Sequence, residues 1–142
     1  MTLFAGQSRE QLRGAYRDAW RKRCAGLPLQ PLEAQITDVI AAHPEYHDLI
    51  TDEGSVHQDF EAPGGPGNPF LHLGLHLALR EQIATDRPAG IALIHRQLTA
   101  RVGGPHAAEH RMIELLAELL SEAQRSGLPP QESIYLERLR RL

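Results

Sequence analysis

Prolines and glycines divide this chain into segments, and within most segments the apolar residues recur at the spacing of an α-helix. Residues three and four positions apart share one helix face, whereas a half-buried strand alternates apolar and polar residues. No segment shows that alternation. The pattern predicts an all-α, single-domain helical bundle of five to six helices spanning residues 1–142. The expected helices cover about residues 8–25, 31–43, 69–85, 89–101, 106–126 and 131 onwards.

Capping residues mark two of the helix starts. Ser8 and Gln11 have the spacing of a capping box, and Asn68 precedes Pro69 as an N-cap before a first-turn proline. Residues 51–68, which include PGGPGN, are expected to form the one long loop, with a lid over a site as a secondary idea. The fifth helix has the widest apolar face, made by Ile113, Leu116, Ala117, Leu119 and Leu120.

Composition argues against several classes of protein. The formal charge of −3 and the pI near 6.2 disfavour a general nucleic-acid binder. A single cysteine, Cys24, rules out an intrachain disulfide and any cysteine-rich zinc motif. The first residues lack the regions of a signal peptide, and no apolar run approaches the ~20 residues of a membrane span. We therefore expect a soluble, cytoplasmic protein without a membrane partner.

Six of the eight histidines form pairs spaced i, i+4, in the segments HPEYH, HLGLH and HAAEH. Random placement of eight histidines in 142 residues would give roughly 0.4 such pairs, so chance is a poor explanation. On a helix, residues four apart share a face, with Cβ atoms about 6 Å apart. Two imidazoles so placed can bind one transition-metal ion, as in the HExxH helix. The pairs are His43/His47, His72/His76 and His106/His110.

The three pairs would meet if the helices alternate in direction along the chain. Short connections favour antiparallel neighbours, so the third and fifth helices would run parallel, with their N-termini at one end. The HPEYH segment ends the second helix and would reach the same end. A helix N-terminus disfavours a protonated imidazole and so favours the neutral form that binds metals. We therefore expect a metal site at one end of the bundle.

The expected metal and its ligands follow from the residue types. Imidazoles with carboxylates suit a divalent transition metal, and zinc or iron is the leading choice. In an enzyme, the metal would activate water or oxygen, with Glu109 or Glu81 as general base. The substrate is not indicated by any motif. The predicted ligands are, first, His72, His76, His106 and His110, and then His43, His47 and Glu114.

Two alternatives to a metal site stay open. Inward histidines often hydrogen-bond to carbonyls or carboxylates, and the pairs would then be polar core residues of a metal-free protein, such as a homodimer. The second alternative is an interaction module that contacts protein or nucleic acid through a ladder of arginines on the first helix. The simpler explanation of that ladder is a solvated outer face. The ladder consists of Arg9, Arg13, Arg17 and Arg21.

The familiar motifs of metal enzymes are missing from the sequence. It contains no HExxH, and no Glu-x-x-His pair like those of the ferritin-like di-iron proteins. Three spacings resemble the ligand spacings of hemerythrin-like bundles, but their order along the chain differs, so the likeness concerns ligand chemistry alone. These spacings are His72/His76, His110/Glu114 and His43/Asp48.

Longer segments make the chain resemble one family. HPEYH, NPFLHLGLHLALREQ, DRPAGI, HAAEH and YLERLRR are similar to segments of the small bacterial proteins grouped as domain of unknown function 1841. The likeness runs from about residue 20 to the end of the chain. The family has no assigned activity, so the resemblance implies a type of protein that carries this histidine arrangement and implies no mechanism.

Overall fold

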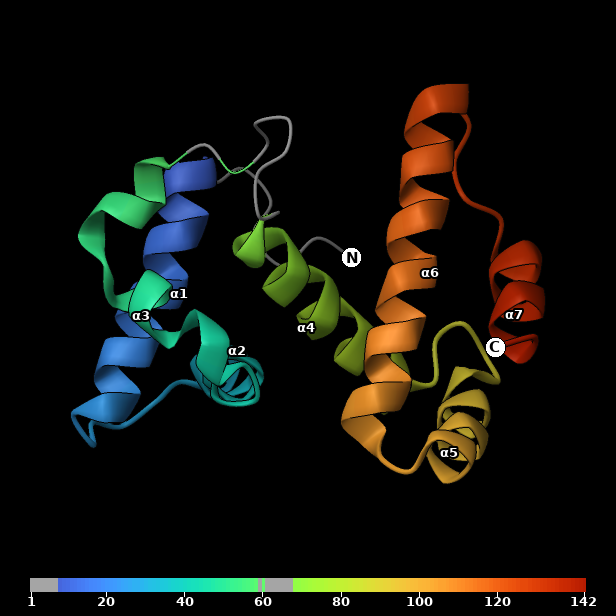
Figure 1. Cartoon of the computed structure of the whole chain (residues 1–142), viewed down its shortest axis with the longest axis horizontal. Helices are drawn as coiled ribbons and strands as arrows, with labels where there is room; N and C mark the ends of the chain where they lie inside the picture. Colours follow the sequence, from blue (N-terminus) through green and yellow to red (C-terminus); the bar gives the residue numbers. More distant parts are fainter. Residues whose placement is uncertain (1–7, 59, 61–67) are drawn as a thin grey trace. The chain divides into compact units, whose positions relative to one another are not determined.

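The computed structural model describes residues 8–58, 60 and 68–142. Over these residues it has seven α-helices, two short 3-10 helices and no strand, so the all-α prediction is confirmed (Figure 1). The count exceeds the expected five to six because the chain after His43 forms η1 (Pro44–Tyr46), α3 (His47–Thr51) and η2 (Glu53–His57). The prediction of one long loop over residues 51–68 is wrong at its start, since Thr51 ends α3 and Glu53–His57 form η2. Residues 59 and 61–67, and with them the idea of a lid, lie outside the described residues.

The chain divides into two compact units, Met1–Leu73 and Gly74–Leu142. In the first unit, α1 (Arg9–Cys24) packs against α2 (Pro31–Ala41), α3 and η2. Tyr16 and Trp20 of α1 are 3% and 8% exposed, so both are core residues. The first unit also contains the start of α4 (Pro69–Thr85), the helix in which the boundary between the units falls.

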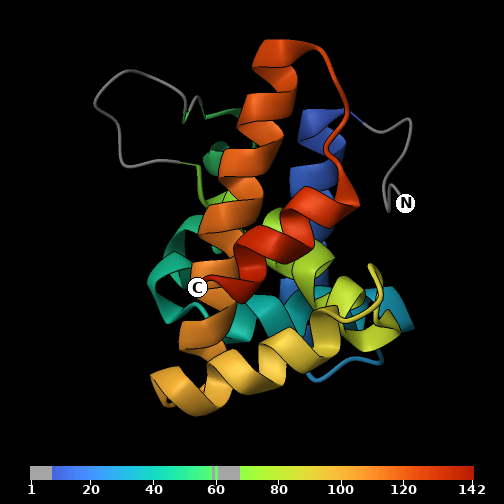
Figure 2. The ribbon, with the colours of Figure 1, turned by 90° about the vertical axis from the view of Figure 1, so that its right-hand side faces the viewer.

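The second unit contains residues 74–85 of α4 and three further helices. In this unit α6 packs against both α5 and α7, and Figure 2 shows α5 crossing the beginning of α6. Buried side chains from all four helices form one apolar core, which includes Leu79, Leu98, Met112 and Leu139. Among the described helices, none is long and apolar enough to cross a membrane. The further helices are α5 (Ile91–Val102), α6 (Pro105–Ser126) and α7 (Glu132–Arg140).

The third and fifth predicted helices, α4 and α6, do not run parallel. In Figures 1 and 2 the chain descends along residues 74–85 of α4 and rises along α6, so the parallel arrangement expected from the sequence is wrong. Alternation fails because α5 lies across the beginning of α6 and not alongside it. The apolar face of α6 also departs from expectation at one position, since Leu120 is 43% exposed and Leu119 is buried.

The predicted helix starts are confirmed by hydrogen bonds. The Ser8 hydroxyl accepts from the Gln11 backbone N–H at 3.1 Å, and the Gln11 side chain accepts from the Ser8 backbone N–H at 2.9 Å. The Asn68 side-chain oxygen accepts from the Leu71 backbone N–H at 3.2 Å. These bonds satisfy N–H groups that have no partner inside a helix. The cap at Asn68 fixes the start of α4, the helix that carries His72 and His76.

Arg13, the second member of the arginine ladder, is a buried residue of the first unit. It is 2% exposed, so the expectation of a solvated ladder is wrong at this position. Its Nη1 donates to the carbonyl oxygens of Val56 at 3.3 Å and Gln58 at 2.8 Å. Its guanidinium carbon lies 5.3 Å and 5.0 Å from the ring centroids of Phe60 and Phe70. The side chain therefore fastens the segment after η2 to α1 through hydrogen bonds and cation–π contacts.

The cations in the last turn of α1 have carboxylate neighbours. Arg21 lies 3.3 Å from Glu53, and Lys22 lies 2.9 Å from Glu33. Arg23 lies 3.0 Å from Asp38. The three pairs lie at the surface, although Glu33 is half-buried, and each contributes little to stability. Because the neighbouring acids offset the positive charge, this face gives no further support to the nucleic-acid alternative.

Replacing Arg13 with alanine is expected to lower the free energy of unfolding by about 2 kcal/mol, because the carbonyls of Val56 and Gln58 would lose a charged donor in a buried place. Arg9→Ala is the matched control on the same helix, since Arg9 is exposed and pairs only with Glu10 at 3.7 Å among the contacts described. Its expected effect is below about 0.5 kcal/mol. Denaturant unfolding measures both variants. An equal loss of unfolding free energy would show that the buried contacts of Arg13 do not contribute to stability.

Candidate metal centre

In the first unit, His43 and His72 face each other through their ring nitrogens. His43 follows α2 and is fully buried. Pro44 disfavours helical backbone at His43, so the helix ends before it and the chain turns into η1. Its Nδ1 lies 2.7 Å from the carbonyl oxygen of Val39, and its Nε2 lies 3.0 Å from Nε2 of His72. His72 lies in the first turn of α4 and is half-buried.

The hydrogen bond to Val39 determines the tautomer of His43. A carbonyl oxygen can only accept, so Nδ1 of His43 carries the proton. In the neutral ring, Nε2 then carries the lone pair that points to His72. Imidazole nitrogen in this state is a metal ligand, and the bond from the opposite nitrogen to a carbonyl is typical of ligating histidines. Without metal, the same geometry is a hydrogen bond donated by Nε2 of His72.

In the second unit, the buried carboxylate of Glu109 accepts three hydrogen bonds. Oε1 accepts from Nε2 of His76 at 2.8 Å and from Nε of Arg80 at 3.0 Å. Oε2 accepts from Nε2 of His95 at 3.0 Å. Because the carboxylate holds the proton of His76 on Nε2, the neutral ring carries its lone pair on Nδ1. Glu109 thus orients His76, which is itself fully buried, by the carboxylate–histidine arrangement of metal sites.

The charge state of Glu109 follows from its partners. Burial raises the pKa of this carboxyl group, but hydrogen bonds from His76, Arg80 and His95, with the charge of Arg80, outweigh burial and lower the pKa to about 2. Glu109 is therefore ionised at neutral pH. A carboxylate held at so low a pKa is a weak base, although it is a strong acceptor.

The low pKa predicts a specific dependence of stability on pH. Because the pKa of Glu109 is about 2 in the folded state and near 4.5 in the unfolded state, the ionised group stabilises the fold above pH 4.5 and loses this effect as pH falls toward 2. In metal-free protein, the stability difference between wild type and Glu109→Gln should shrink by roughly 2–3 kcal/mol from pH 6 to about pH 2.5. Urea unfolding at several pH values measures this, and parallel curves would contradict it.

The rings of three histidines gather beside Glu109 in the second unit. The ring centroids of His76 and His110 are 5.6 Å apart, those of His76 and His106 are 5.8 Å apart, and those of His106 and His110 are 4.1 Å apart. His106 and His110 lie in the first two turns of α6, as the i, i+4 spacing predicts. His110 is half-buried, whereas His106 is exposed.

Four histidines have ring nitrogens close to one another. One nitrogen from each of His43, His72, His76 and His110 lies within 4.8 Å of the other three, a grouping that could hold a metal ion. His72 and His76 are one turn apart on the continuous helix α4, so helix geometry alone places them on one face. Two members are fully buried and two are half-buried. The grouping includes one residue from HPEYH, both histidines of HLGLH and one from HAAEH.

The other predicted site residues lie outside this group of four. Nε2 of His47 lies 2.9 Å from the carbonyl oxygen of Ile40, and its ring lies 4.6 Å from that of Trp20. The side chain of Glu114 is exposed, one turn beyond His110 on α6. Glu81 is half-exposed on α4, and its backbone carbonyl accepts from the Thr85 hydroxyl at 2.8 Å. His106 contacts the rings of His76 and His110 from an exposed position.

Tyr46 is the residue of the site that sequence reasoning missed. Its ring stacks on His43 with centroids 5.5 Å apart and planes 3° apart, and it meets His72 edge-on at 6.0 Å. Burial and the neighbouring charge of Glu45 raise the pKa of Tyr46, so the hydroxyl keeps its proton at neutral pH. The available signal was its position between the histidines of HPEYH. His95, which lies outside the three histidine pairs, serves as the third donor to Glu109.

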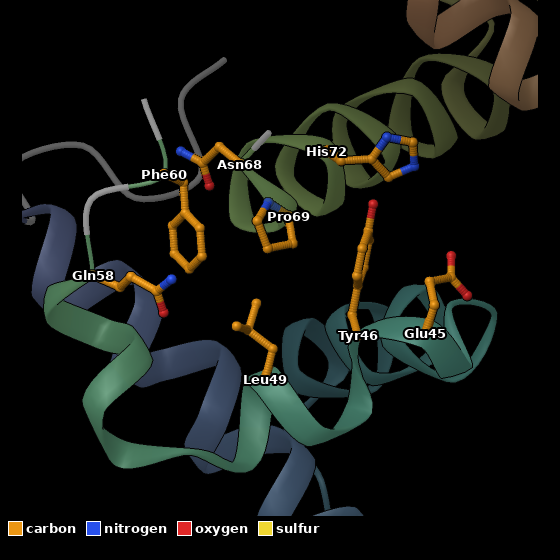
Figure 3. A pocket seen from close by; sticks show the side chains of 8 residues that line it. All are labelled: Glu45, Tyr46, Leu49, Gln58, Phe60, Asn68, Pro69 and His72. Atoms are coloured by element: carbon orange, nitrogen blue, oxygen red, sulfur yellow. The ribbon is translucent and has the colours of Figure 1, made fainter. Parts of the chain in front are cut away.

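A cavity of about 470 Å³ borders His72 within the first unit (Figure 3). Its size is in the range of small-molecule sites. The apolar part of the lining comes from Leu49, Phe60, Pro69 and the ring of Tyr46. The polar part comes from Glu45, Gln58, Asn68 and His72.

The fold and these side chains define a class of protein, an all-α chain with a histidine cluster that could hold a metal ion. Within that class, the chain belongs to the family described as domain of unknown function (DUF1841), whose model matches residues 8–141. Comparisons with curated proteins and with solved structures found no match. The family description names no activity, so a function must be argued from the geometry of the site.

Proposed function

We propose that this protein binds one divalent transition-metal ion through His43, His72, His76 and His110. The observation that carries the proposal is the approach of four ring nitrogens to within 4.8 Å of one another. An isolated buried histidine is commonly satisfied by one carbonyl or carboxylate. Four imidazoles with ring nitrogens this close to one another match the ligand set of a transition-metal ion, because neutral imidazole nitrogen is a common ligand of such ions.

The spacing of His43 and His72 fits a coordination shell. Zinc–nitrogen bonds of about 2.0–2.1 Å at tetrahedral angles put two ligand nitrogens about 3.3 Å apart, and right angles put them about 2.9 Å apart. The two Nε2 atoms are 3.0 Å apart. An ion could therefore replace the hydrogen bond between the two rings without a large movement of either helix.

The groups behind the ligands support the same proposal. Val39 and Glu109 bind the opposite nitrogens of His43 and His76, which fixes the ring orientation and increases ligand basicity. Glu109 was a candidate general base from the sequence. We assign it instead to positioning His76, because both its oxygens accept hydrogen bonds from side chains and its pKa is about 2. Glu81 receives no role in this proposal.

The chemistry of the ligands narrows the choice of ion. Imidazole nitrogen suits zinc, copper, iron and nickel, whereas calcium and magnesium prefer oxygen. Zinc with four protein ligands would be a closed structural site, while iron with four imidazoles would keep positions open for water or an oxygen ligand. In both cases the ligands are neutral, so they leave the charge of the ion uncompensated. An ion of this kind can polarise an oxygen donor that reaches it.

Elemental analysis of untagged protein tests the proposal. We expect about one zinc or iron ion per chain after purification or after addition of the metal and gel filtration. His57→Ala is the control, because His57 is exposed and does not belong to the group of four. Its metal content should equal that of the wild type. Protein that retains none of zinc, iron, nickel or copper after loading would overturn the proposal and leave the histidines as a hydrogen-bonded polar core.

A further inference from the structure

The cavity beside His72 differs from the proposed metal centre in its chemistry. Figure 3 shows Leu49, Phe60 and Pro69 around its middle, with His72 and the hydroxyl of Tyr46 at one end. The tyrosine hydroxyl points toward the His72 ring in this view. One end of the cavity thus has polar groups next to a proposed ligand, whereas its middle offers an apolar surface.

The wall of the cavity is held in place by buried contacts. Arg13 binds the Gln58 carbonyl at 2.8 Å and lies against Phe60, and the Phe60 ring is 5.9 Å from that of Phe70. Tyr46 is fixed by its stacking on His43. A wall made rigid in this way loses little conformational entropy when a ligand binds, which favours binding.

We infer that this cavity is the ligand pocket of the metal centre and that it takes a small molecule with an apolar body and an oxygen-donor head such as a carboxylate or hydroxamate. The inference rests on the proposed metal site. The apolar body would be buried against Leu49, Phe60 and Pro69. The oxygen head would be directed to the metal end, where the hydroxyl of Tyr46 can donate a hydrogen bond to it. An anionic head suits an ion held by four neutral imidazoles.

The charges of the lining separate this ligand class from two others. Among the lining residues that the structure describes, Glu45 carries the formal charge and none is a lysine or an arginine, so no cationic side chain there would match the charge of a phosphate. An organic cation would lie near the guanidinium of Arg13, which is 5.3 Å from the Phe60 ring behind the wall. A carboxylate or hydroxamate carries at most one negative charge, so it needs less compensation than a phosphate, and its apolar body fits the apolar lining.

Cobalt-loaded protein with two hydroxamates provides the test. Benzohydroxamate carries a ring for the pocket, whereas acetohydroxamate presents the same head with only a methyl group. We expect benzohydroxamate to bind at least about 10-fold more tightly, because the ring leaves water for an apolar surface. Calorimetry gives the affinities, and a change in the visible cobalt spectrum shows that the head reaches the metal.

Two variants separate the pocket from the metal. Leu49→Trp fills the cavity from a half-exposed position and should abolish the preference for benzohydroxamate, with cobalt binding unchanged. Tyr46→Phe keeps the stacking on His43 and should weaken both hydroxamates about 3–10-fold. Leu93→Trp, at an exposed leucine of α5, is the control and should leave all affinities unchanged.

The outcomes distinguish this inference from the proposed function. If wild-type protein shows no spectrum of bound cobalt, both the proposed metal centre and the ligand pocket are wrong. Intact cobalt binding with equal affinity for the two hydroxamates, or with a preference that Leu49→Trp leaves unchanged, would overturn the pocket alone. A preference that disappears in Leu49→Trp, together with an unchanged cobalt affinity, is the result that the inference requires.

Discussion

Replacing His72 and His110 together with alanine is expected to reduce bound metal from about one ion per chain to below about 0.1. The reason is the loss of half of the proposed ligands. These two residues are the half-buried members of the group, so their truncation disturbs the core less than a change at His43 or His76. Chelator should lower the melting temperature of the wild type and leave that of the variant unchanged, because metal stabilises only the state that binds it.

His57→Ala and His106→Ala complete this experiment. The first variant controls for the loss of a histidine at an exposed site and should keep full metal content. The second tests the ligand assignment directly, because His106 contacts the rings of His76 and His110 but is absent from the group of four. We expect His106→Ala to retain the ion. Full metal content in the double variant would contradict the assignment of His72 and His110.

Glu109→Ala is expected to lower the free energy of unfolding by about 3–5 kcal/mol, the largest stability effect that we predict. Truncation would leave the guanidinium of Arg80 and the N–H groups of His76 and His95 without their acceptor. Burial makes this loss costly, since Glu109 is 6% exposed and water cannot easily replace the carboxylate. Denaturant unfolding of metal-free protein measures the effect without a contribution from bound metal.

Glu114→Ala is the matched control for this prediction. It removes the same side chain from the same helix, but Glu114 is exposed. A change below about 0.5 kcal/mol is expected. If both variants lose the same stability, the effect belongs to helix propensity or net charge and the hydrogen-bonded network of Glu109 contributes little.

Local rules were sufficient to predict most of the helices. Helix ends depend on hydrogen bonds or backbone angles within one turn, so the sequence near them is enough to predict them. Examples are the capping box at Ser8, the Asn68–Pro69 start and the glycine at residue 127. The short helix α3 and the 3-10 turns were not predicted as separate helices. A helix of five residues presents too few apolar positions to show a period.

The i, i+4 pattern identified the histidines but could not say which of them converge. His72 and His76 share a face by helix geometry, and this part of the prediction needs no tertiary structure. The contact of His76 with α6 depends on how α4 crosses that helix, and the parallel model gave the wrong reason for it. Whether His47 or His106 joins the ligands depends on tertiary distances of a few ångströms, which spacing does not encode.

Arg13 is a buried residue that the sequence pattern assigned to the surface. Its place in a regular ladder of arginines favours a solvated face, and the sequence contains no sign of the two carbonyls that bind it. Those carbonyls belong to residues more than forty positions away. Buried charges are rare and depend on distant partners, so a local pattern assigns them to the surface by default.

X-ray absorption spectroscopy of the metal-loaded protein tests the central claim most directly. Four histidine ligands predict a first shell of nitrogen scatterers at about 2.0–2.2 Å, with the multiple-scattering features of about four imidazole rings. The His72→Ala/His110→Ala variant should show neither the bound metal nor these features. A first shell made mainly of oxygen, or one with a single imidazole, would contradict a metal centre built from His43, His72, His76 and His110.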